Sequence, residues 1–407
     1  MQGVTTTPLL CRPLPAAPRR LQVALVTETW LPEINGVAIT LRHCVDGLLA
    51  RGHGVEVIRP RQPGETATSG VPGLREVAVR GLTLPCYDTL KFGLTSVAAL
   101  RRRWTAQRPD IVHIATEGPL GWAALRAARA LALPVSTDFH TNFHAYSAHY
   151  GAAWLRQPIL RYLRHFHNRA TATFVPTTAM VEELQRLGFR NLVCVPRGVD
   201  TRRFSPAHRA PALRAAWGVG DDDPVVLCVG RLAPEKNLAL ALQSFGAIRR
   251  RCAPARLVMV GDGPLRADLA AANPDLVFAG QRTGADLAAH YASADLFLFP
   301  SLTETYGNVT LEALASGLPV VAYDYAATGE HVRHGRNGVA VPYGDATAFV
   351  DHAAALASDA DRLRRLGAAA RETAERLDWS VIAGEFARTL LHLTTQEWHE
   401  YPLGLSA

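Results

Sequence analysis

Several features that define large classes of proteins are missing from this sequence. No apolar run reaches the roughly 20 residues that a membrane-spanning helix needs, and residues 1–20 lack the long apolar core of a signal peptide. The six cysteines contain no C-x-x-C pair, which disfavours disulfides and cysteine-ligated metal. The dinucleotide fingerprint G-x-G-x-x-G is also absent. These absences predict a cytoplasmic protein with singly buried thiols and no dinucleotide cofactor.

Length and composition predict a globular chain with more than one domain. The 407 residues exceed what one hydrophobic core usually organises, and 48% apolar with 19% charged residues is typical of a folded protein. A formal charge of +7 allows nucleic acid, acidic lipid or a phosphorylated substrate as partners without choosing between them. No basic helix with interleaved base-stacking aromatics lies at a groove-reading position, so nucleic-acid binding is disfavoured.

Short apolar runs alternate with helical spacing, and this βα alternation occurs twice. Predicted strands lie at 22–27, 55–59, 111–114, 134–137, 172–176, 192–196, 225–230, 257–260, 277–279, 296–300, 319–323 and 339–342. The pattern predicts an α/β protein with two Rossmann-like domains that face each other across a cleft. Its predicted parts are a flexible leader at 1–20, a first domain at 21–198, a second domain at 199–377 and a C-terminal helix at 378–407 that returns to the first domain.

Two connecting stretches have the composition of loops. Residues 60–80 are rich in proline, glycine and threonine and predict a surface loop. Residues 197–224 are turn-rich and charged and predict the linker between the domains together with the entry to the second domain. Their aspartate run at 221–223 is more typical of a solvated turn than of a metal site.

The stretch 296–323 predicts a strand, a polar loop, a helix from Asn308 and a second strand. Ligands of parallel sheets bind beyond the carboxyl ends of the strands, where this loop lies. The helix start offers unpaired backbone N–H groups and a positive dipole end, which suit a diphosphate. Glu304 and Glu312 lie eight positions apart beside it. They accept hydrogen bonds from substrate hydroxyls, or they are a capping acid and a solvated helix acid; both interpretations stay open.

Four other residues follow the ends of three predicted strands. Arg231 and Lys236 follow the strand 225–230, and two cations there predict a pyrophosphate clamp. Gly36 lies in the turn after the first strand, either as a plain turn glycine or as a site where backbone approaches a ligand closely. His140 follows the strand 134–137, and a structural or a functional role is equally open.

The segment 154–169 interleaves apolar and arginine residues at helical spacing. A basic amphipathic helix can lie on an anionic membrane surface, and the arginines at 101–103 would extend such a patch. The alternative is a domain helix with one solvated basic face. The sequence leaves this choice open.

Together, these motifs resemble those of the GT-B glycosyltransferases of retaining family 4. The resemblance is carried by the E-x7-E pair, by 230–237, by the V-G-D-G-P run at 260–264 and by the Asn35-Gly36 turn, and it covers nearly all of 21–390. Within the family, 27–37 and 138–143 resemble GDP-mannose-dependent α-mannosyltransferases that act on lipid or polyprenol-like acceptors. Sulfoquinovosyl transferases, which use a UDP-sugar, are similar at the same places.

The resemblance implies a role for each matching residue. Catalytic positions are His140 at the donor sugar, Glu304 at sugar hydroxyls, and Arg231 and Lys236 at the diphosphate. Positions that bind the nucleotide sugar are Gly36, Asp262, Gly307, Asn308, Val309 and Glu312, the last at the ribose. The resemblance implies no metal and no cofactor, because the cations and the helix end stabilise the leaving diphosphate.

The implied activity is transfer of a hexose from a sugar nucleotide to a hydroxyl group with retained anomeric configuration. The favoured donor is GDP-mannose, and the favoured acceptor is lipid-linked or a glycan, at the inner face of the plasma membrane. A UDP-sugar-dependent glucosyl or sulfoquinovosyl transferase is the alternative, and a sugar-nucleotide epimerase is a further one. A glycoside hydrolase is disfavoured, because it would have no use for the cations Arg231 and Lys236. A non-catalytic binding module is another alternative, and it would bind nucleoside diphosphate without turnover.

Overall fold

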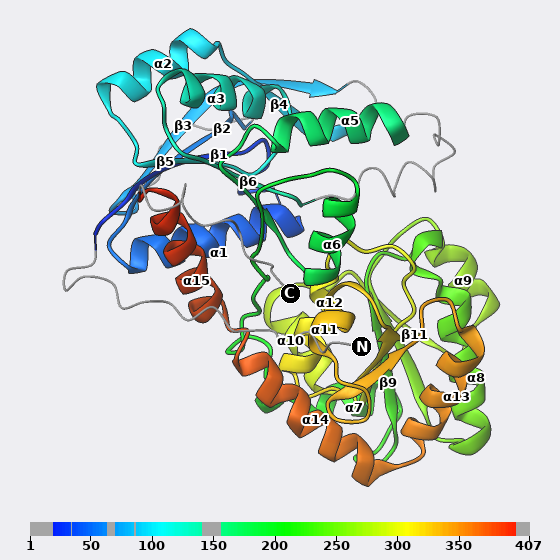
Figure 1. The fold of residues 1–407 in the computed structure, drawn as a ribbon. Coiled ribbons are helices and arrows are strands. Elements are labelled where there is room, and N and C mark those ends of the chain that lie inside the picture. Colours follow the sequence, from blue (N-terminus) through cyan, green and yellow to red (C-terminus); the bar gives the residue numbers. More distant parts are fainter. Residues whose placement is uncertain (1–18, 34, 63–69, 85–86, 141–155, 396–407) are drawn as a thin grey trace, which may run out of the picture. The chain divides into compact units, whose positions relative to one another are not determined.

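A computed structural model describes residues 19–33, 35–62, 70–84, 87–140 and 156–395 (Figure 1). These residues form two compact units, and within the described ranges the chain changes unit after residue 196 and again after residue 381. Unit 1 holds the described residues up to 196 and those from 382 onward, and unit 2 holds 197–381. Each unit contains its own sheet, so each is described by itself.

Unit 1 is built on an eight-stranded sheet in the order β4-β3-β2-β1-β5-β6-β7-β8. Its strands are β1 (Gln22–Val26), β2 (Gly54–Pro60), β3 (Leu74–Leu84), β4 (Tyr87–Leu94), β5 (Ile111–Ile114), β6 (Val135–Asp138), β7 (Ala172–Val175) and β8 (Leu192–Cys194). All neighbours pair in parallel except β3 and β4. The order reverses between β1 and β5, which makes their carboxyl ends the place where a parallel sheet binds ligands.

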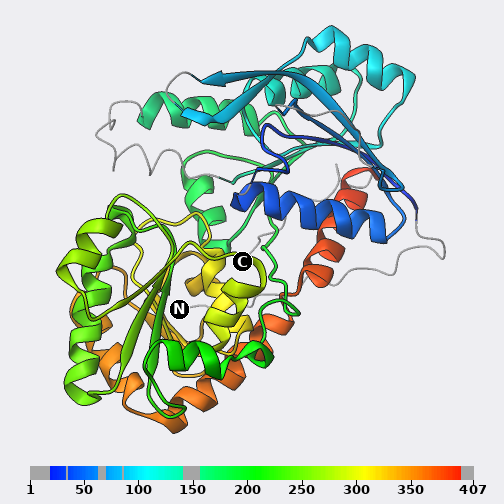
Figure 2. The same ribbon diagram turned by 180° about the vertical axis from the view of Figure 1, so that it is seen from behind.

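The helices of unit 1 connect these parallel strands. They are α1 (Gly36–Ala50), α2 (Val97–Ala106), α3 (Pro119–Ala130), α5 (Arg156–His167) and α6 (Thr178–Arg186). The C-terminal helix α15 (Trp379–Leu393) enters unit 1 at Ile382. It lies against α1 in both ribbon views (Figures 1 and 2). A Cβ atom on Gly47 of α1 would lie 2.1 Å from the Cβ of Ala383, so the two helices approach closely only because Gly47 has no side chain. The predicted return of the C-terminal helix to the first domain is confirmed.

The prediction of a surface loop over 60–80 is wrong for its last seven residues. Residues from Leu74 onward form β3, which pairs in parallel with β2 and in antiparallel register with β4. Arg75 and Arg80 are exposed on this strand, so its polar composition resembles that of a loop. β3 is held by pairing with a strand on each side, and the composition of the segment alone does not show this pairing.

Unit 2 is built on a six-stranded, all-parallel sheet in the order β11-β10-β9-β12-β13-β14. Its strands are β9 (Val225–Val229), β10 (Arg256–Val260), β11 (Val277–Gly280), β12 (Leu296–Phe299), β13 (Val320–Tyr323) and β14 (Gly338–Val341). Val225 and Leu227 of β9 enter one buried cluster, and Val226 and Cys228 enter another. Burial on both faces explains the uninterrupted apolar runs of these strands.

Helices pack against both faces of this sheet. They are α7 (Pro211–Ala216), α8 (Leu238–Arg251), α9 (Arg266–Ala272), α10 (Gly284–Ala292), α11 (Asn308–Ala315), α12 (Ala326–His331), α13 (Ala346–Ala357) and α14 (Ala360–Glu375), with short 3₁₀ turns at Pro206–His208 and Pro234–Lys236. The helix predicted from Asn308 begins at that residue. The two-domain α/β prediction is therefore confirmed.

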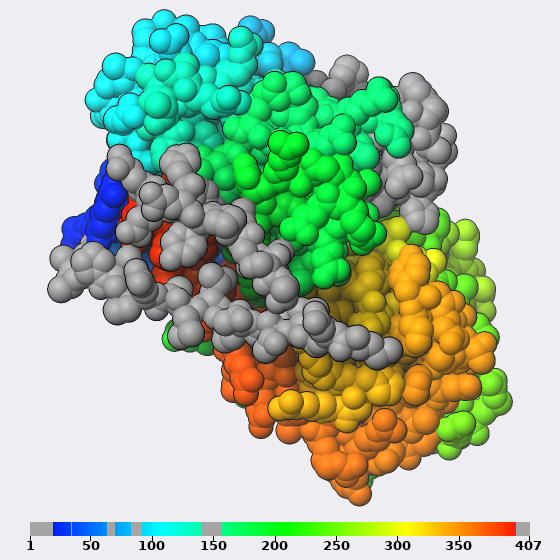
Figure 3. All heavy atoms as spheres, viewed as in Figure 1, coloured from blue at the N-terminus to red at the C-terminus, as the bar shows by residue number. Residues whose placement is uncertain are grey.

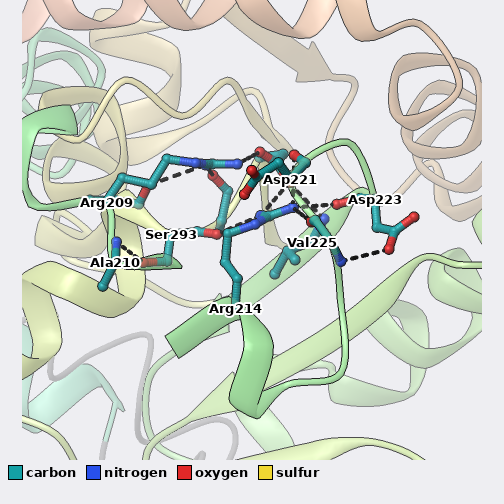
Figure 4. Close-up of polar contacts among 11 residues, drawn as sticks. Arg209, Ala210, Arg214, Asp221, Asp223, Val225 and Ser293 are labelled. Atoms are coloured by element: carbon teal, nitrogen blue, oxygen red, sulfur yellow. Dashed lines mark hydrogen bonds and ion pairs between the residues drawn. The ribbon is translucent and has the colours of Figure 1, made fainter. Parts of the chain in front are cut away.

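The stretch predicted as a linker, 197–224, is a packed part of unit 2. Phe204, Trp217 and Val219 are buried in its core. Arg214 of α7 is 1% exposed and donates hydrogen bonds to the carbonyl oxygens of Gly220 (2.6 Å) and Asp223 (2.7 Å) (Figure 4). The same guanidinium also donates to the carbonyls of Asp221 and Ser293 and to the Asp295 carboxylate. The aspartate run therefore belongs to an arginine-bound turn.

The thiols only partly match the prediction of single burial. Cys44 and Cys228 are buried, Cys252 is partly buried, and Cys194 at the end of β8 is exposed. Cys11 and Cys86 lie outside the described residues. Cys194 is exposed because β8 is a three-residue strand at the end of the sheet.

We expect Arg214→Ala to lower the stability of unit 2 strongly. The substitution leaves the Asp295 carboxylate and several turn carbonyls without their shared donor, and removing one partner of a buried pair costs about 3–5 kcal/mol. The measurement is urea unfolding followed by tryptophan fluorescence.

The matched control is Arg364→Ala, since Arg364 on α14 is exposed and pairs only with Asp361 in the described structure. Its unfolding midpoint should stay within error of the parent, because exposed ion pairs contribute little. Equal midpoints for the two variants would show that the Arg214 network does not stabilise the unit.

Candidate active site

Residues that the sequence assigns to the diphosphate lie at the carboxyl edge of the unit 2 sheet. The strand order reverses between β9 and β12, so the loops that follow these two strands begin at the switch point. The β9 loop carries Arg231 and Lys236, and the β12 loop carries Glu304. The β9 and β12 loops share this edge because the strands are parallel, so all their carboxyl ends lie on the same side of the sheet.

Backbone contacts hold the β9 and β10 loops together. Leu232 N–H donates to the carbonyl of Asp262 (2.9 Å), and Leu265 N–H donates back to the carbonyl of Leu232 (3.0 Å). A Cβ on Gly261, which has φ +139°, would lie 1.9 Å from the carbonyl oxygen of Gly230. Glycine is therefore required there by close approach of the two loops.

Lys236 and Glu304 are in direct contact. The Lys236 Nζ donates to Glu304 Oε1, and the hydroxyl of Ser301 donates to the same oxygen (2.8 Å). Both charged side chains are mostly buried, and the Lys236 ammonium lies 5.7 Å from the centre of the Phe299 ring. The chain has only two lysines, so a lysine at this position is distinctive. The structure therefore brings one predicted cation and one predicted acid together.

Arg231 and Asp262 do not join that pair in the described structure. The Arg231 side chain is 60% exposed, with its guanidinium 3.7 Å from the Glu235 carboxylate. Asp262 is exposed and accepts hydrogen bonds from Gly263 N–H (2.8 Å) and Arg266 (3.2 Å). Both side chains follow strand ends at the carboxyl edge of the sheet, and each contacts a residue four positions further along the chain.

The start of α11 has the properties of an anion site. Gly307 precedes it with φ +86°, and no side chain caps the first N–H groups. Asn308 and Val309 are the first helical residues, and neither they nor Thr310 is acidic. The buried hydroxyl of Thr310 has no hydrogen-bond partner in the described structure. Uncapped N–H groups and the dipole favour a negatively charged group at this end.

Glu312 contacts a partner that the sequence did not predict. Its Oε2 accepts a hydrogen bond from the Tyr291 hydroxyl (2.9 Å) on α10. Burial raises the pKa of Glu312 to about 7, although the Tyr291 hydrogen bond and the charge of Arg203 act in the opposite direction. The carboxyl group is therefore readily protonated near neutral pH. Glu304 and Glu312 thus have different partners, and neither is the solvated acid of the alternative interpretation.

Tyr306 links the β12 loop to Arg197, the first described residue of unit 2. Its hydroxyl donates to the carbonyl of Arg197 (3.2 Å) and lies 2.8 Å from His331 Nε2. Burial lowers the pKa of His331 to about 4, so its ring is neutral. Because the one proton of the Tyr306 hydroxyl is directed to Arg197, the His331 Nε2–H donates to the phenol oxygen. Tyr306 was not predicted from the sequence. The feature that could have indicated it is a large aromatic residue inside an otherwise polar loop.

In unit 1, the predicted residue Gly36 opens α1 directly after Asn35. The Asn35 side chain accepts hydrogen bonds from the N–H groups of Val37 (3.1 Å) and Ala38 (2.9 Å), which is a helix cap. Asn35 also donates to the Thr29 hydroxyl (2.6 Å). Asn35 therefore caps the helix that Gly36 opens, and Gly36 itself is exposed, which leaves both interpretations of this glycine open.

His140 belongs to a cluster with Asp138 and His113. The Nε2 atoms of His140 and His113 lie 2.9 Å and 3.0 Å from Asp138 Oδ2. Burial by itself would raise the pKa of Asp138, but the two adjacent histidines outweigh it and hold that pKa well below its usual range. Sequence reasoning identified only His140. The missed signal was a histidine inside the apolar strand 111–114.

Two further acids at the same sheet edge were not predicted. Glu28 follows β1 and accepts a hydrogen bond from Leu120 N–H (3.1 Å) at the start of α3. Burial raises its pKa to about 7, and burial raises the pKa of Glu117, which follows β5, to about 7 as well. The carboxyl ends of β1 and β5 therefore each carry an acid with a pKa near neutral pH.

Two further properties of the described residues concern metal binding and membrane crossing. In the described ranges, no three histidine, cysteine, aspartate or glutamate side chains are arranged to hold a metal ion. Within the same part of the chain, every helix is too short or too polar to cross a bilayer.

Comparisons with known proteins agree with this geometry. Residues 34–203 match the family Glycosyltransferase Family 4, and residues 223–359 match Glycosyl transferases group 1. The chain is 35% identical to a GDP-mannose-dependent alpha-mannosyltransferase of Mycobacterium tuberculosis over 376 residues, which span 90% of this chain and 95% of that protein. It is 32% identical to the sulfoquinovosyl transferase SQD2 of Arabidopsis thaliana, with 77% of this chain and 63% of that protein covered.

The fold is also found among solved structures. Sucrose-phosphate synthase of Thermosynechococcus elongatus superposes with a TM-score of 0.75 at 21% identity, covering 92% of this chain and 99% of that one. The family resemblance carried by the sequence motifs is thereby confirmed. The chain belongs to glycosyltransferase family 4 and is a hexosyltransferase.

Proposed function

We propose that the protein transfers α-mannose from GDP-mannose to a hydroxyl group of a lipid-linked or glycan acceptor, with the anomeric configuration retained. The similarity to GDP-mannose-dependent relatives along 90% of the chain is the observation that supports GDP-mannose as the donor. The retained configuration follows from the family resemblance. Unit 2 holds the nucleotide sugar, and unit 1 supplies groups for the sugar and the acceptor.

Lys236 stabilises the diphosphate as it leaves. A lysine ammonium has three donors, so Lys236 can keep its bond to Glu304 and still donate to a phosphate oxygen. Glu304 orients the ammonium and has a second carboxylate oxygen for sugar hydroxyls. The largely exposed Arg231 can turn onto the phosphates without breaking a buried contact. The departing phosphate accepts the proton of the acceptor hydroxyl.

The other groups position the substrate. N–H groups of Gly307, Asn308 and Val309 meet the sugar and phosphate at the uncapped start of α11. Glu312 binds the ribose hydroxyls and exchanges its Tyr291 partner for them.

The remaining contacts of the donor come from two loops. Asp262 lies on the β10 loop beside the nucleotide. From unit 1, His140 contacts the donor sugar, and Gly36 allows the backbone to approach the phosphate closely. No metal takes part, because the two cations and the helix end supply the positive charge.

A UDP-sugar-dependent transferase is the second candidate function. SQD2, a sulfoquinovosyl transferase, is 32% identical over 327 residues. The difference between the two donors lies in the base and the sugar, and the phosphate-binding groups would serve either donor.

A thermal-shift panel of GDP, UDP, ADP and their sugars, each with Mg²⁺ and with EDTA, tests the donor. We expect GDP and GDP-mannose to give the largest rise in Tm, because a ligand at 100 times its Kd stabilises by about 2.7 kcal/mol. The rise should be the same with EDTA, since no metal is needed. A larger shift with the uridine series would favour the second candidate, and loss of the shift in EDTA would contradict metal independence.

We expect Lys236→Ala to lower kcat by at least about tenfold, since losing one charge-directed donor typically costs about 3 kcal/mol of transition-state stabilisation. The assay measures mannose transfer at saturating donor. Lys236→Arg should retain part of the activity because it keeps the charge.

The matched control for this prediction is Arg249→Ala. Arg249 is an exposed cation of the same unit, ion-paired with Asp275, and its loss should leave kcat unchanged. Near-normal turnover in Lys236→Ala would remove the clamp from the mechanism.

The membrane proposal rests on α5. Its apolar residues Leu160, Leu163 and Phe166 are buried in the core of unit 1, which agrees with a domain helix. Arg161 and Arg164 are exposed on its outer side, and α5 (green) forms part of the surface of unit 1 (Figure 3). Trp154 and Leu155, also predicted for this helix, lie outside the described residues. Contact with anionic lipid is therefore electrostatic and involves no insertion of the apolar face.

We expect salt-sensitive binding to vesicles that contain phosphatidylserine and none to phosphatidylcholine vesicles. Replacing Arg161 and Arg164 by glutamine should weaken sedimentation with the anionic vesicles, at about 1 kcal/mol for each arginine near the surface. The control replaces Arg364 and Arg365 on α14 of unit 2 in the same way. Equal sedimentation with neutral and anionic vesicles at low salt would refute the proposal.

A further inference from the structure

Two tyrosines follow the adjacent parallel strands β13 and β14 of unit 2. The strand register pairs Tyr323 with Val341, the last residues of the two strands, and Tyr325 and Tyr343 each lie two residues beyond these ends. β12 is the next strand of the same sheet, and it ends just before the loop that carries Glu304. Parallel pairing therefore brings both tyrosines and this loop to one edge of the sheet.

Both phenol hydroxyls bind the backbone of that loop. The Tyr325 hydroxyl donates a hydrogen bond to the carbonyl of Ser301 (3.1 Å), and the Tyr343 hydroxyl donates one to the carbonyl of Leu302 (2.8 Å). These carbonyls belong to consecutive residues, and the loop 301–307 contains no helix or strand. Two neighbouring points of an irregular backbone are therefore held from the side of β13 and β14.

The same two residues also contact the predicted cation and acid. The Ser301 hydroxyl donates to Glu304 Oε1 (2.8 Å), the oxygen that accepts from Lys236 Nζ. Leu302 N–H donates to the carbonyl of Glu235 (3.4 Å), the residue before Lys236. A displacement of the backbone at 301–302 would therefore change both the support of the carboxylate and the approach of the ammonium.

The tyrosine rings form a small cluster that restricts the two hydroxyls. The ring centres of Tyr325 and Tyr343 lie 5.2 Å apart in an edge-on contact, and the Tyr323 ring lies 5.6 Å from that of Tyr343. Tyr343 is 59% exposed, so its ring gains little from burial. A tyrosine has only two side-chain torsions and loses little conformational entropy when its hydroxyl is fixed. Its bond to the loop explains the position of Tyr343 better than a contribution to the core.

We propose that Tyr325 and Tyr343 are positioning residues that brace the backbone at 301–302 and thereby set the contact between Glu304 and Lys236. Each tyrosine acts through a loop carbonyl and not on the substrate itself. The consequence for catalysis rests on the proposed function, in which Glu304 holds the sugar and Lys236 stabilises the leaving diphosphate. Removing the two hydroxyls then lowers turnover while every catalytic group stays in place.

The effect on the pair can be measured at Lys236 itself, because the chain has only two lysines. The whole protein labelled with ¹³C at lysine Cε gives two NMR signals, and Lys91→Arg assigns them. Glu304→Gln gives the signal of Lys236 without its carboxylate partner. We expect Tyr325→Phe combined with Tyr343→Phe to move the Lys236 signal part of the way toward that position. In the Glu304→Gln background the same two changes should move it no further.

Tyr323→Phe is the matched control for the two hydroxyls. Tyr323 belongs to the same cluster, with its ring against those of Tyr343 and Phe349. No hydrogen bond joins its hydroxyl to residues 301–304, all of which the structure describes. All three phenylalanine variants keep the ring contacts, so they differ only in which hydroxyl is lost. The Lys236 signal and kcat of Tyr323→Phe should therefore match those of the parent.

Turnover at saturating donor tests the consequence for catalysis. Each of Tyr325→Phe and Tyr343→Phe should lower kcat roughly 2- to 10-fold, the range for one hydrogen bond. The double variant should lower kcat further, with circular dichroism and Tm close to those of Tyr323→Phe.

The outcomes separate the positioning role from the proposed function. An unchanged Lys236 signal in the double variant overturns the positioning role, whatever the activity. A displaced signal with the kcat of the parent keeps the positioning role and refutes the part that the proposed function gives to the contact between Glu304 and Lys236. An equal displacement in Tyr323→Phe, or a further displacement in the Glu304→Gln background, shows that the two hydroxyls do not act through Glu304 and overturns the proposal.

Discussion

Parallel strand pairing is the constraint on which the rest of this structure depends. In unit 2 both faces of the sheet are buried, as the division of β9 between two apolar clusters illustrates. Polar side chains can then gather only beyond the strand ends, and parallel pairing brings all carboxyl ends to one edge. Lys236 and Glu304, 68 residues apart in sequence, meet there because their strands are adjacent.

Most of the architecture could be predicted from the sequence, since buried parallel strands leave uninterrupted apolar runs. The helix from Asn308 and the strand 111–114 begin where the pattern places them. The β3 strand and the packed course of 197–224 could not be predicted in this way. Their stability comes from partners distant in sequence, such as the Arg214 guanidinium that binds several turn carbonyls.

The same distinction applies to the site. The E-x7-E spacing and the two cations identified Lys236 and Glu304, because charged residues in a loop contrast with an apolar surrounding. Asp138 and His113 were not identified, since one buried histidine in a strand is usually structural. The contact between them depends on strand register: parallel pairing places His113 opposite Ser136, and only the folded sheet shows that Asp138 lies next to it.

Tyr306 has a consequence for how unit 2 responds to a substrate. Its ring belongs to the loop beside the uncapped helix start, and its hydroxyl is bonded to Arg197, where the chain enters this unit. A rearrangement of the loop that displaces the ring must either break that bond or carry the entry segment with it. Movements of the loop beside the start of α11 and of the segment at Arg197 are therefore coupled through the Tyr306 hydroxyl.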